Sequence, residues 1–129
     1  PVLEQDIAIS NIALDFIGQA RNFYQYAAEL SGNEATEDSL AFLRDVTEFK
    51  NVLITELPNG DWAQTTLRQF LFSAYQYYSY QQLQNSSDTR LAAIAAKSLK
   101  EVTYHLRWSS EWVIRLGDGT EESKQRLLT

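Results

Sequence analysis

The sequence predicts an all-α protein: an up-down-up-down four-helix bundle followed by the start of a fifth helix. Three observations support this fold class. Proline occurs only at positions 1 and 58, which leaves long stretches free of helix breakers. No run of alternating apolar and polar residues between turn signals indicates a β-hairpin. The expected connections between helices are short, and short connections favour antiparallel neighbours.

The first two helices are expected over residues 4–30 and 37–55. The pair Gly32–Asn33 follows the first helix and provides a stop signal. Thr36 precedes the second helix as a plausible N-cap, and the two acidic residues after it suit the positive end of a helix dipole.

The third and fourth helices are expected over residues 61–84 and 89–116. The segment Asp61–Gln64 has the pattern of a capping box that opens the third helix. Asn85–Asp88 forms a short loop whose last residue can cap the fourth helix, and Gly117 is expected at its C′ position.

Length and composition indicate one domain, residues 1–129, with a core of its own. The absence of cysteine excludes disulfides and thiolate metal sites, and the net charge of −6 argues against a nucleic-acid-binding surface. No apolar run approaches the roughly 20 residues that span a bilayer, so we expect a cytoplasmic protein. The chain opens without methionine and closes about two turns into a helix that begins near Thr120. We therefore expect a fragment of a longer subunit.

His105, the only histidine, lies one helical turn after Glu101. A di-iron site in a helical bundle takes one Glu from each of two helices and a Glu-x-x-His pair from each of the other two. Here the Glu precedes the His by four residues, and Val102 occupies the place of the expected Glu. The interpretation we favour is a buried structural pair, with Asp15 or Arg107 as a third partner, rather than a metal ligand set.

Three further positions bear on whether the bundle holds a metal site. Asp15 lies on a polar stripe of the first helix, where it is either a metal ligand or, as we favour, a buried carboxylate held by amides and an Arg. Glu48 and Asn51 have Glu-x-x-His spacing, but Asn is a poor iron ligand compared with imidazole. The third helix carries no acid between Leu67 and Gln84. We predict no catalytic residue and no metal ligand in this chain.

The first helix carries only two charges, Asp15 and Arg21, over residues 7–28. A surface helix normally has a polar half. Two interpretations stay open: a central helix within the remainder of the same protein, or a subunit interface. The aromatic residues of the third helix also favour a protein contact surface, where Tyr and Trp are enriched.

Four segments in combination resemble one family, the structural (C) component of bacterial phenylacetyl-CoA 1,2-epoxidases. They are Asn11–Asn22, Tyr26–Leu30, Leu57–Gly60, and Lys100–Glu101 with Tyr104–Arg107. The resemblance implies a ferritin-like fold and a multicomponent monooxygenase that adds one oxygen atom of O2 across the ring of phenylacetyl-CoA. It also implies that a partner subunit holds the di-iron centre, that a reductase with flavin and an iron–sulfur cluster passes electrons from NADPH, and that this chain has no cofactor. The chain would correspond to about the first half of such a subunit.

By this resemblance, the chain is a non-catalytic structural subunit that pairs with the catalytic di-iron subunit. Degenerate metal-site positions would then serve as structural polar contacts; they are Asp15, Glu48, Asn51, Glu101 and His105. Two alternatives stay open. One is a divergent di-metal oxygenase that uses the four ionisable members of this set, and the other is a free-standing helical interaction module. Metal content and co-purification separate the three.

Overall fold

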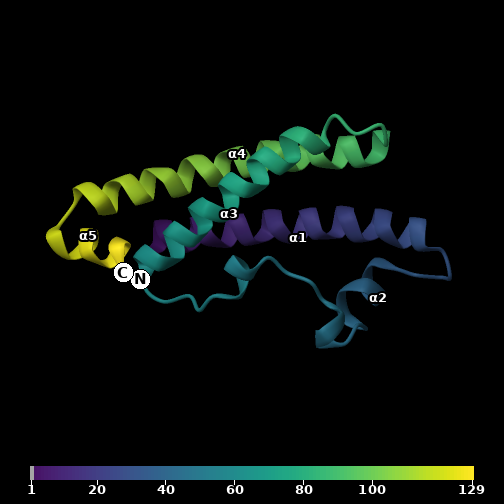
Figure 1. Ribbon diagram of the computed structural model, residues 1–129, viewed down its shortest axis with the longest axis horizontal. Helices are drawn as coiled ribbons and strands as arrows, with labels where there is room; N and C mark the ends of the chain where they lie inside the picture. The colour runs from purple at the N-terminus through teal and green to yellow at the C-terminus, as the bar shows by residue number, and fades with distance from the viewer. Residues whose placement is uncertain (1) are drawn as a thin grey trace.

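The computed structural model describes residues 2–129, and within that range the chain is all-α, with no strand (Figure 1). It confirms the predicted class and is consistent with a ferritin-like helical bundle. The α-helices are α1 (Leu3–Ser31), α2 (Glu37–Phe42), α3 (Trp62–Leu83), α4 (Thr89–Asp118) and α5 (Glu121–Leu128). Two short 3-10 helices, η1 (Val46–Glu48) and η2 (Leu53–Glu56), lie between α2 and α3.

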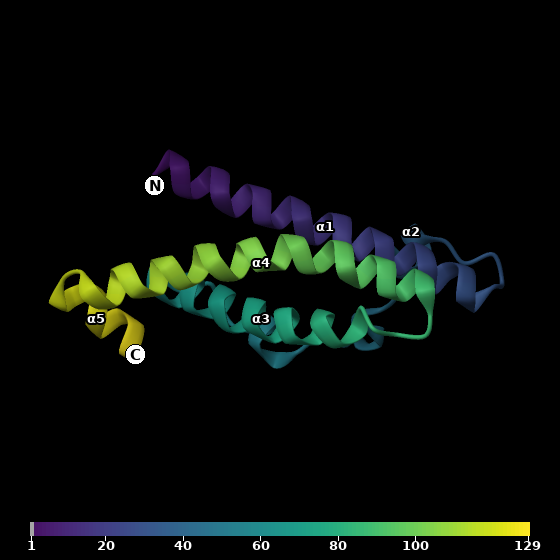
Figure 2. The same cartoon turned by 90° about the horizontal axis from the view of Figure 1, so that it is seen from above.

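Helix α4 lies between α1 and α3 and contacts both, as Figure 2 shows. It runs antiparallel to α1 and to α3 (Figure 1), so the long helices keep the predicted alternation of direction. Helix α5 folds back against the end of α4 and the start of α3, and both chain termini lie at this end of the molecule.

The prediction of one helix over residues 37–55 is wrong. Helix α2 ends at Phe42, and the chain then runs through η1 and η2. The Asp45 side chain accepts a hydrogen bond from the Val46 N–H, and Glu48 accepts one from the Asp45 N–H, so local bonds replace helical ones. Residues of low helix propensity fill this region: Val46, Thr47, Val52, Ile54 and Thr55. The segment still leads the chain back to the start of α3 (Figure 1).

The predicted helix starts are confirmed by their caps. Thr36, Asp61 and Thr120 each accept from the N–H three residues on, in reciprocal capping boxes, and Asp88 accepts from the first N–H groups of α4. These bonds satisfy donors that have no partner inside a helix.

The predicted helix ends are confirmed at one place and displaced at another. Helix α1 ends before Gly32, whose φ of 64° lies in the left-handed region that glycine adopts without strain. Helix α4 continues through Gly117 to Asp118, so its end lies two residues beyond the expected one.

The interface between α3 and α4 is built from small side chains. The fully buried small residues of these two helices are Thr66 and Ser73 on α3 and Ala95, Ser98, Val102 and Ser109 on α4. Small side chains let two helix backbones approach closely. The hydroxyls of Thr66 and Ser109 donate to carbonyls one turn back in their own helices, at 2.9 and 2.7 Å. These two hydroxyl groups therefore keep hydrogen-bond partners although the helices pack closely around them.

Candidate functional site

The candidate site lies between α1 and α4 and begins with one hydrogen bond. Nε2 of His105 lies 2.8 Å from Oδ2 of Asp15. The His105 side chain is fully buried, whereas that of Asp15 is 36% exposed. Because a carboxylate can only accept, the Nε2 atom carries the hydrogen and donates it to Asp15. His105 is therefore bonded to Asp15, which was expected only as a third partner, and not to Glu101. The partner of Asp15 is this imidazole rather than the expected Arg.

Aromatic rings enclose the imidazole. The centroids of the Phe16 and Tyr104 rings lie 5.1 and 6.2 Å from the imidazole centroid, and both rings meet the imidazole edge-on. Nδ1 of His105 is buried and has no hydrogen-bond partner within residues 2–129. The imidazole thus has one polar contact, to α1, and is otherwise held by packing.

A second hydrogen-bonded pair lies one turn along the same interface. Nε2 of Gln19 donates to Oε2 of Glu101 at 3.2 Å, and the Tyr80 hydroxyl of α3 donates to Oε1 of Gln19 at 3.3 Å. Gln19 is buried, and its two hydrogen bonds connect α1 to both α3 and α4. Burial also raises the pKa of the Tyr80 phenol above its ordinary value, which keeps that phenol a donor.

The two hydrogen-bonded pairs are spaced by one helical turn on both helices. Gln19 follows Asp15 by four residues, and Glu101 precedes His105 by four. Residues four apart lie on one helix face, so antiparallel helices bring the two pairs together as successive cross-links. Sequence reasoning missed Gln19 and Tyr80 as members of the site. The matching i, i+4 spacing on the two helices was the signal that could have found Gln19.

Two sequence-predicted positions lie elsewhere. Glu48 is exposed in η1, where Oε2 accepts from the Asp45 N–H at 2.6 Å. Asn51 is exposed on the connection between η1 and η2. The structure therefore brings together Asp15, Glu101 and His105 but not Glu48 or Asn51.

The donor set at this interface does not fit a di-iron centre. Such a centre uses four carboxylates and two histidines. Asp15 and His105 are hydrogen-bonded to each other, and Glu101 is bonded to Gln19. No group of three or more His, Cys, Asp or Glu side chains placed to hold a metal ion occurs among residues 2–129. We therefore derive no chemical step through a metal in this chain.

Comparison with known proteins agrees with the resemblance seen in the sequence. The sequence profile of the phenylacetic acid catabolic protein family matches residues 1–129. The chain belongs to this family. It is 51% identical over 127 residues to the C subunit of the 1,2-phenylacetyl-CoA epoxidase of Escherichia coli (strain K12). That match covers 98% of the chain and 51% of the relative, so the chain spans about half of the relative's length.

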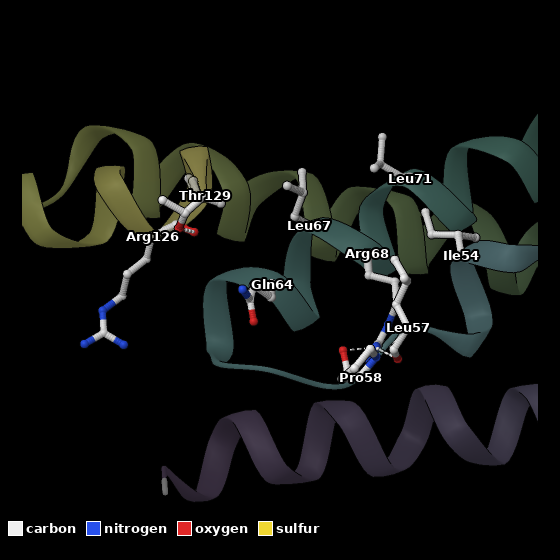
Figure 3. Close-up of a pocket in the computed structure, with 10 residues that line it drawn as sticks. Ile54, Leu57, Pro58, Gln64, Leu67, Arg68, Leu71, Arg126 and Thr129 are labelled. Atoms are coloured by element: carbon white, nitrogen blue, oxygen red, sulfur yellow. Dashed lines mark hydrogen bonds between the residues drawn. The ribbon is translucent and has the colours of Figure 1, made fainter.

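In this family member, a groove of about 340 Å³ lies between η2, α3 and α5 (Figure 3). Its cations already have partners. Arg68 donates to the carbonyls of Leu57 and Pro58 at 2.8 and 2.9 Å, and Arg126 pairs with Glu122 and Asp61. Figure 3 shows the Arg126 guanidinium pointing away from the other lining side chains. The groove is therefore an apolar surface feature without a free charged group for catalysis.

The helices of this family member are not of the membrane-spanning kind. Within residues 2–129, none combines the length and the apolar character that crossing a bilayer requires.

Proposed function

We propose that this chain is a non-catalytic, structural part of a phenylacetyl-CoA 1,2-epoxidase. The observation that carries the proposal is the pair of cross-links Asp15–His105 and Gln19–Glu101. Three of their four side chains, Asp15, Glu101 and His105, are of the carboxylate and imidazole types that a di-iron centre takes as ligands, and here they serve as helix-to-helix contacts. The family match and the relative's name supply the enzyme to which such a part belongs.

In this proposal the chemistry belongs to other subunits. A catalytic subunit holds the di-iron centre and the CoA ester, and a reductase with flavin and iron–sulfur groups delivers electrons from NADPH. Together they add one oxygen atom of O2 across the aromatic ring. This chain contributes no cofactor and no reacting group.

The contribution of the chain is rigid geometry. Helix α4 is held to α3 by close packing of small residues and to α1 by polar contacts that include the two cross-links. A rigid unit of this kind can hold a partner's helices in a fixed arrangement. Small misplacements at a reacting centre reduce rate strongly, so a structural component can raise activity without touching substrate.

Iron content tests the proposal. The chain is purified alone and together with the catalytic subunit, and iron is measured per chain. We expect the iron to follow the catalytic subunit, and His105→Ala to leave the iron content of the complex unchanged. About two irons per copy of this chain, lost in His105→Ala, would establish the divergent oxygenase instead.

Co-purification and activity test the partnership. We expect the catalytic subunit to co-purify with this chain and to lose epoxidase activity when the chain is omitted. Failure of the two to associate would favour the free-standing interaction module.

A further inference from the structure

The turn that leads into α3 contains the dipeptide Asn59–Gly60. An asparagine followed by glycine loses its side-chain amide more easily than other asparagines, because glycine has no side chain to obstruct the attacking nitrogen. Both residues are exposed, and Pro58 and Asp61 on either side also belong to the residue types of surface turns. Water, the co-reactant of this loss, therefore reaches the turn.

The fold requires glycine at position 60 for two independent reasons. Its φ of 61° lies in the left-handed region, which residues with a side chain adopt only with strain. A Cβ at this position would also collide with Oε1 of Gln64. That oxygen accepts from the Asp61 N–H at 3.2 Å in the capping box of α3. The geometry that begins α3 thus keeps in place the residue that makes Asn59 reactive.

The two nitrogen atoms that take part in the loss are not engaged elsewhere. Among residues 2–129, neither the Gly60 N–H nor Nδ2 of Asn59 donates a hydrogen bond. The first is the nucleophile, and the second departs as ammonia. No hydrogen bond has to break before the nitrogen of Gly60 attacks Cγ of Asn59.

The hydrogen bonds of this turn hold oxygen atoms instead. Nη2 of Arg68 donates to Oδ1 of Asn59 at 2.7 Å, and Thr65 Oγ1 donates to the main-chain carbonyl of Asn59 at 2.8 Å. Nη1 of Arg68 donates to the carbonyls of Leu57 and Pro58 (Figure 3). Negative charge develops on Oδ1 when a nitrogen adds to Cγ, and a guanidinium already bonded to that oxygen stabilises the charge. The contact with Arg68 therefore favours the attack.

We propose that Asn59 is a site of spontaneous deamidation that alters the turn ahead of α3. The nitrogen of Gly60 bonds to Cγ of Asn59, its proton passes to Nδ2, and the Cγ–Nδ2 bond breaks to release ammonia. Water then adds to one of the two carbonyl carbons of the resulting succinimide and opens the ring, which gives aspartate or isoaspartate. No group is oxidised or reduced.

The two products act differently on the turn. Aspartate keeps the main chain and places a carboxylate beside Arg68, so an ion pair replaces the hydrogen bond. Isoaspartate routes the main chain through Cβ and Cγ, and the carbonyl that accepts from Thr65 becomes part of a free carboxylate. The longer main chain displaces Asp61, which is the N-cap of α3. Isoaspartate therefore loosens the start of α3, whereas aspartate does not.

Asn85 is a matched control within the same chain. It is also exposed and is followed by a small residue, Ser86. Here, however, the Ser86 N–H donates to the Leu83 carbonyl at 3.0 Å, and Nδ2 of Asn85 donates to the Gln81 carbonyl at 3.0 Å. Both the attacking nitrogen and the departing group are engaged, so Asn85 should react slowly in the folded chain.

Peptide mass spectrometry of the aged protein tests the proposal. The protein is kept folded at mildly alkaline pH and at its full natural length, so that any segment outside residues 1–129 that covers the turn is present. Trypsin cuts after Arg68, which puts Asn59 and Asn85 on separate peptides. We expect Asn59 to convert at least about tenfold faster than Asn85, because only its attacking nitrogen is unengaged. Equal rates, or an intact Asn59, would overturn the proposal.

The same incubation in urea separates the effect of the fold from that of the sequence. Unfolding breaks the hydrogen bond of the Ser86 N–H, so Asn85 should react faster in urea than in the folded chain. Asn59 gains nothing from unfolding and should react no faster. If Asn59 reacted only in urea, the folded turn would protect it and the proposal would fail.

Thermal melting distinguishes the two products. Asn59→Asp imitates the aspartate product and should melt within about 1 °C of the wild type, because the contact with Arg68 persists. The isoaspartyl protein, separated by chromatography, should melt about 3 °C lower, because the N-cap of α3 is displaced. Asn59→Ser has no amide to lose and should keep its melting temperature on ageing. An isoaspartyl protein as stable as Asn59→Asp would refute the loosening of α3.

Discussion

The two sides of helix α4 are held by different physical means. Toward α3 the contact consists of fully buried small residues such as Ala95 and Ser98, and the helices pack by shape. Toward α1 it consists largely of polar contacts. One of them joins a fully buried imidazole to a partly exposed carboxylate. Volume added to the first interface should therefore be destabilising. The second depends on matching donors and acceptors.

This difference separates stability from specificity. Close packing gains dispersion and apolar burial wherever small residues coincide. Polar cross-links add little net free energy, but they penalise every register that leaves a buried donor or acceptor unpaired. We therefore expect the α3–α4 contact to set how stable the chain is, and the α1–α4 contact to set how α1 is aligned.

The largest effect is expected where volume is added to the small-residue interface. Ala95→Leu should destabilise the chain by about 3 kcal/mol, because Ala95 is fully buried. Ala93→Leu, at an exposed position two residues away, is the control and should change stability by less than about 0.5 kcal/mol. Urea denaturation measures both. Similar values for the two would show that α3 and α4 do not pack closely.

Removal of the buried imidazole should rank next. His105→Ala leaves a cavity beside Phe16 and removes the partner of Asp15, at a cost of about 2–3 kcal/mol. The measurement is again the free energy of unfolding. A cost below about 1 kcal/mol would mean that the ring is not packed as the structure shows.

Loss of the carboxylate should cost less than loss of the ring. Asp15→Leu leaves Nε2 of His105 without an acceptor, at about 1–2 kcal/mol, and the partial exposure of Asp15 limits the effect. Asp15→Asn keeps an acceptor oxygen and should cost less than half as much. If a double-mutant cycle of Asp15→Leu with His105→Ala gave no coupling energy, the cross-link would have no energetic role.

The second cross-link should be the weaker one. Gln19→Leu removes the bonds to Glu101 and Tyr80, both only partly buried, and should cost about 1 kcal/mol. Hydrogen exchange of α1 amides should rise with little change in α3. Equal increases in both helices would refute a separate alignment role for this contact.

The smallest effect is expected on the thermal stability of the chain at acidic pH. Asp88 caps α4 and accepts from the Tyr26 hydroxyl, and this bond, with backbone N–H groups, holds the pKa of Asp88 below its ordinary value. A folded-state pKa below the unfolded one stabilises the chain above about pH 4, and this stabilisation is lost as pH falls through the folded pKa. Asp88→Asn should therefore lower the Tm slightly at pH 7 and flatten its decline below pH 4. Asp118→Asn is the control, and a decline as steep as wild type in Asp88→Asn would contradict the assignment.

The sequence by itself determined the helical class, the helix starts and the shortage of side chains that could hold a metal pair. Thr36, Asp61 and Asp88 cap the helices that their positions predicted, because a cap depends on atoms within a few residues. The lack of acids on the third helix was likewise visible in the chain alone, as was the family resemblance.

Tertiary structure decided the rest. The sequence had paired Glu101 with its neighbour His105, whereas the fold gives each a partner on α1, Gln19 and Asp15. Residues 43–55 lost their predicted helix because local capping at Asp45 and β-branched residues outweigh a weak periodic signal. Partners across an interface depend on how two helices align, and that alignment is a balance over the whole fold rather than a property of either segment.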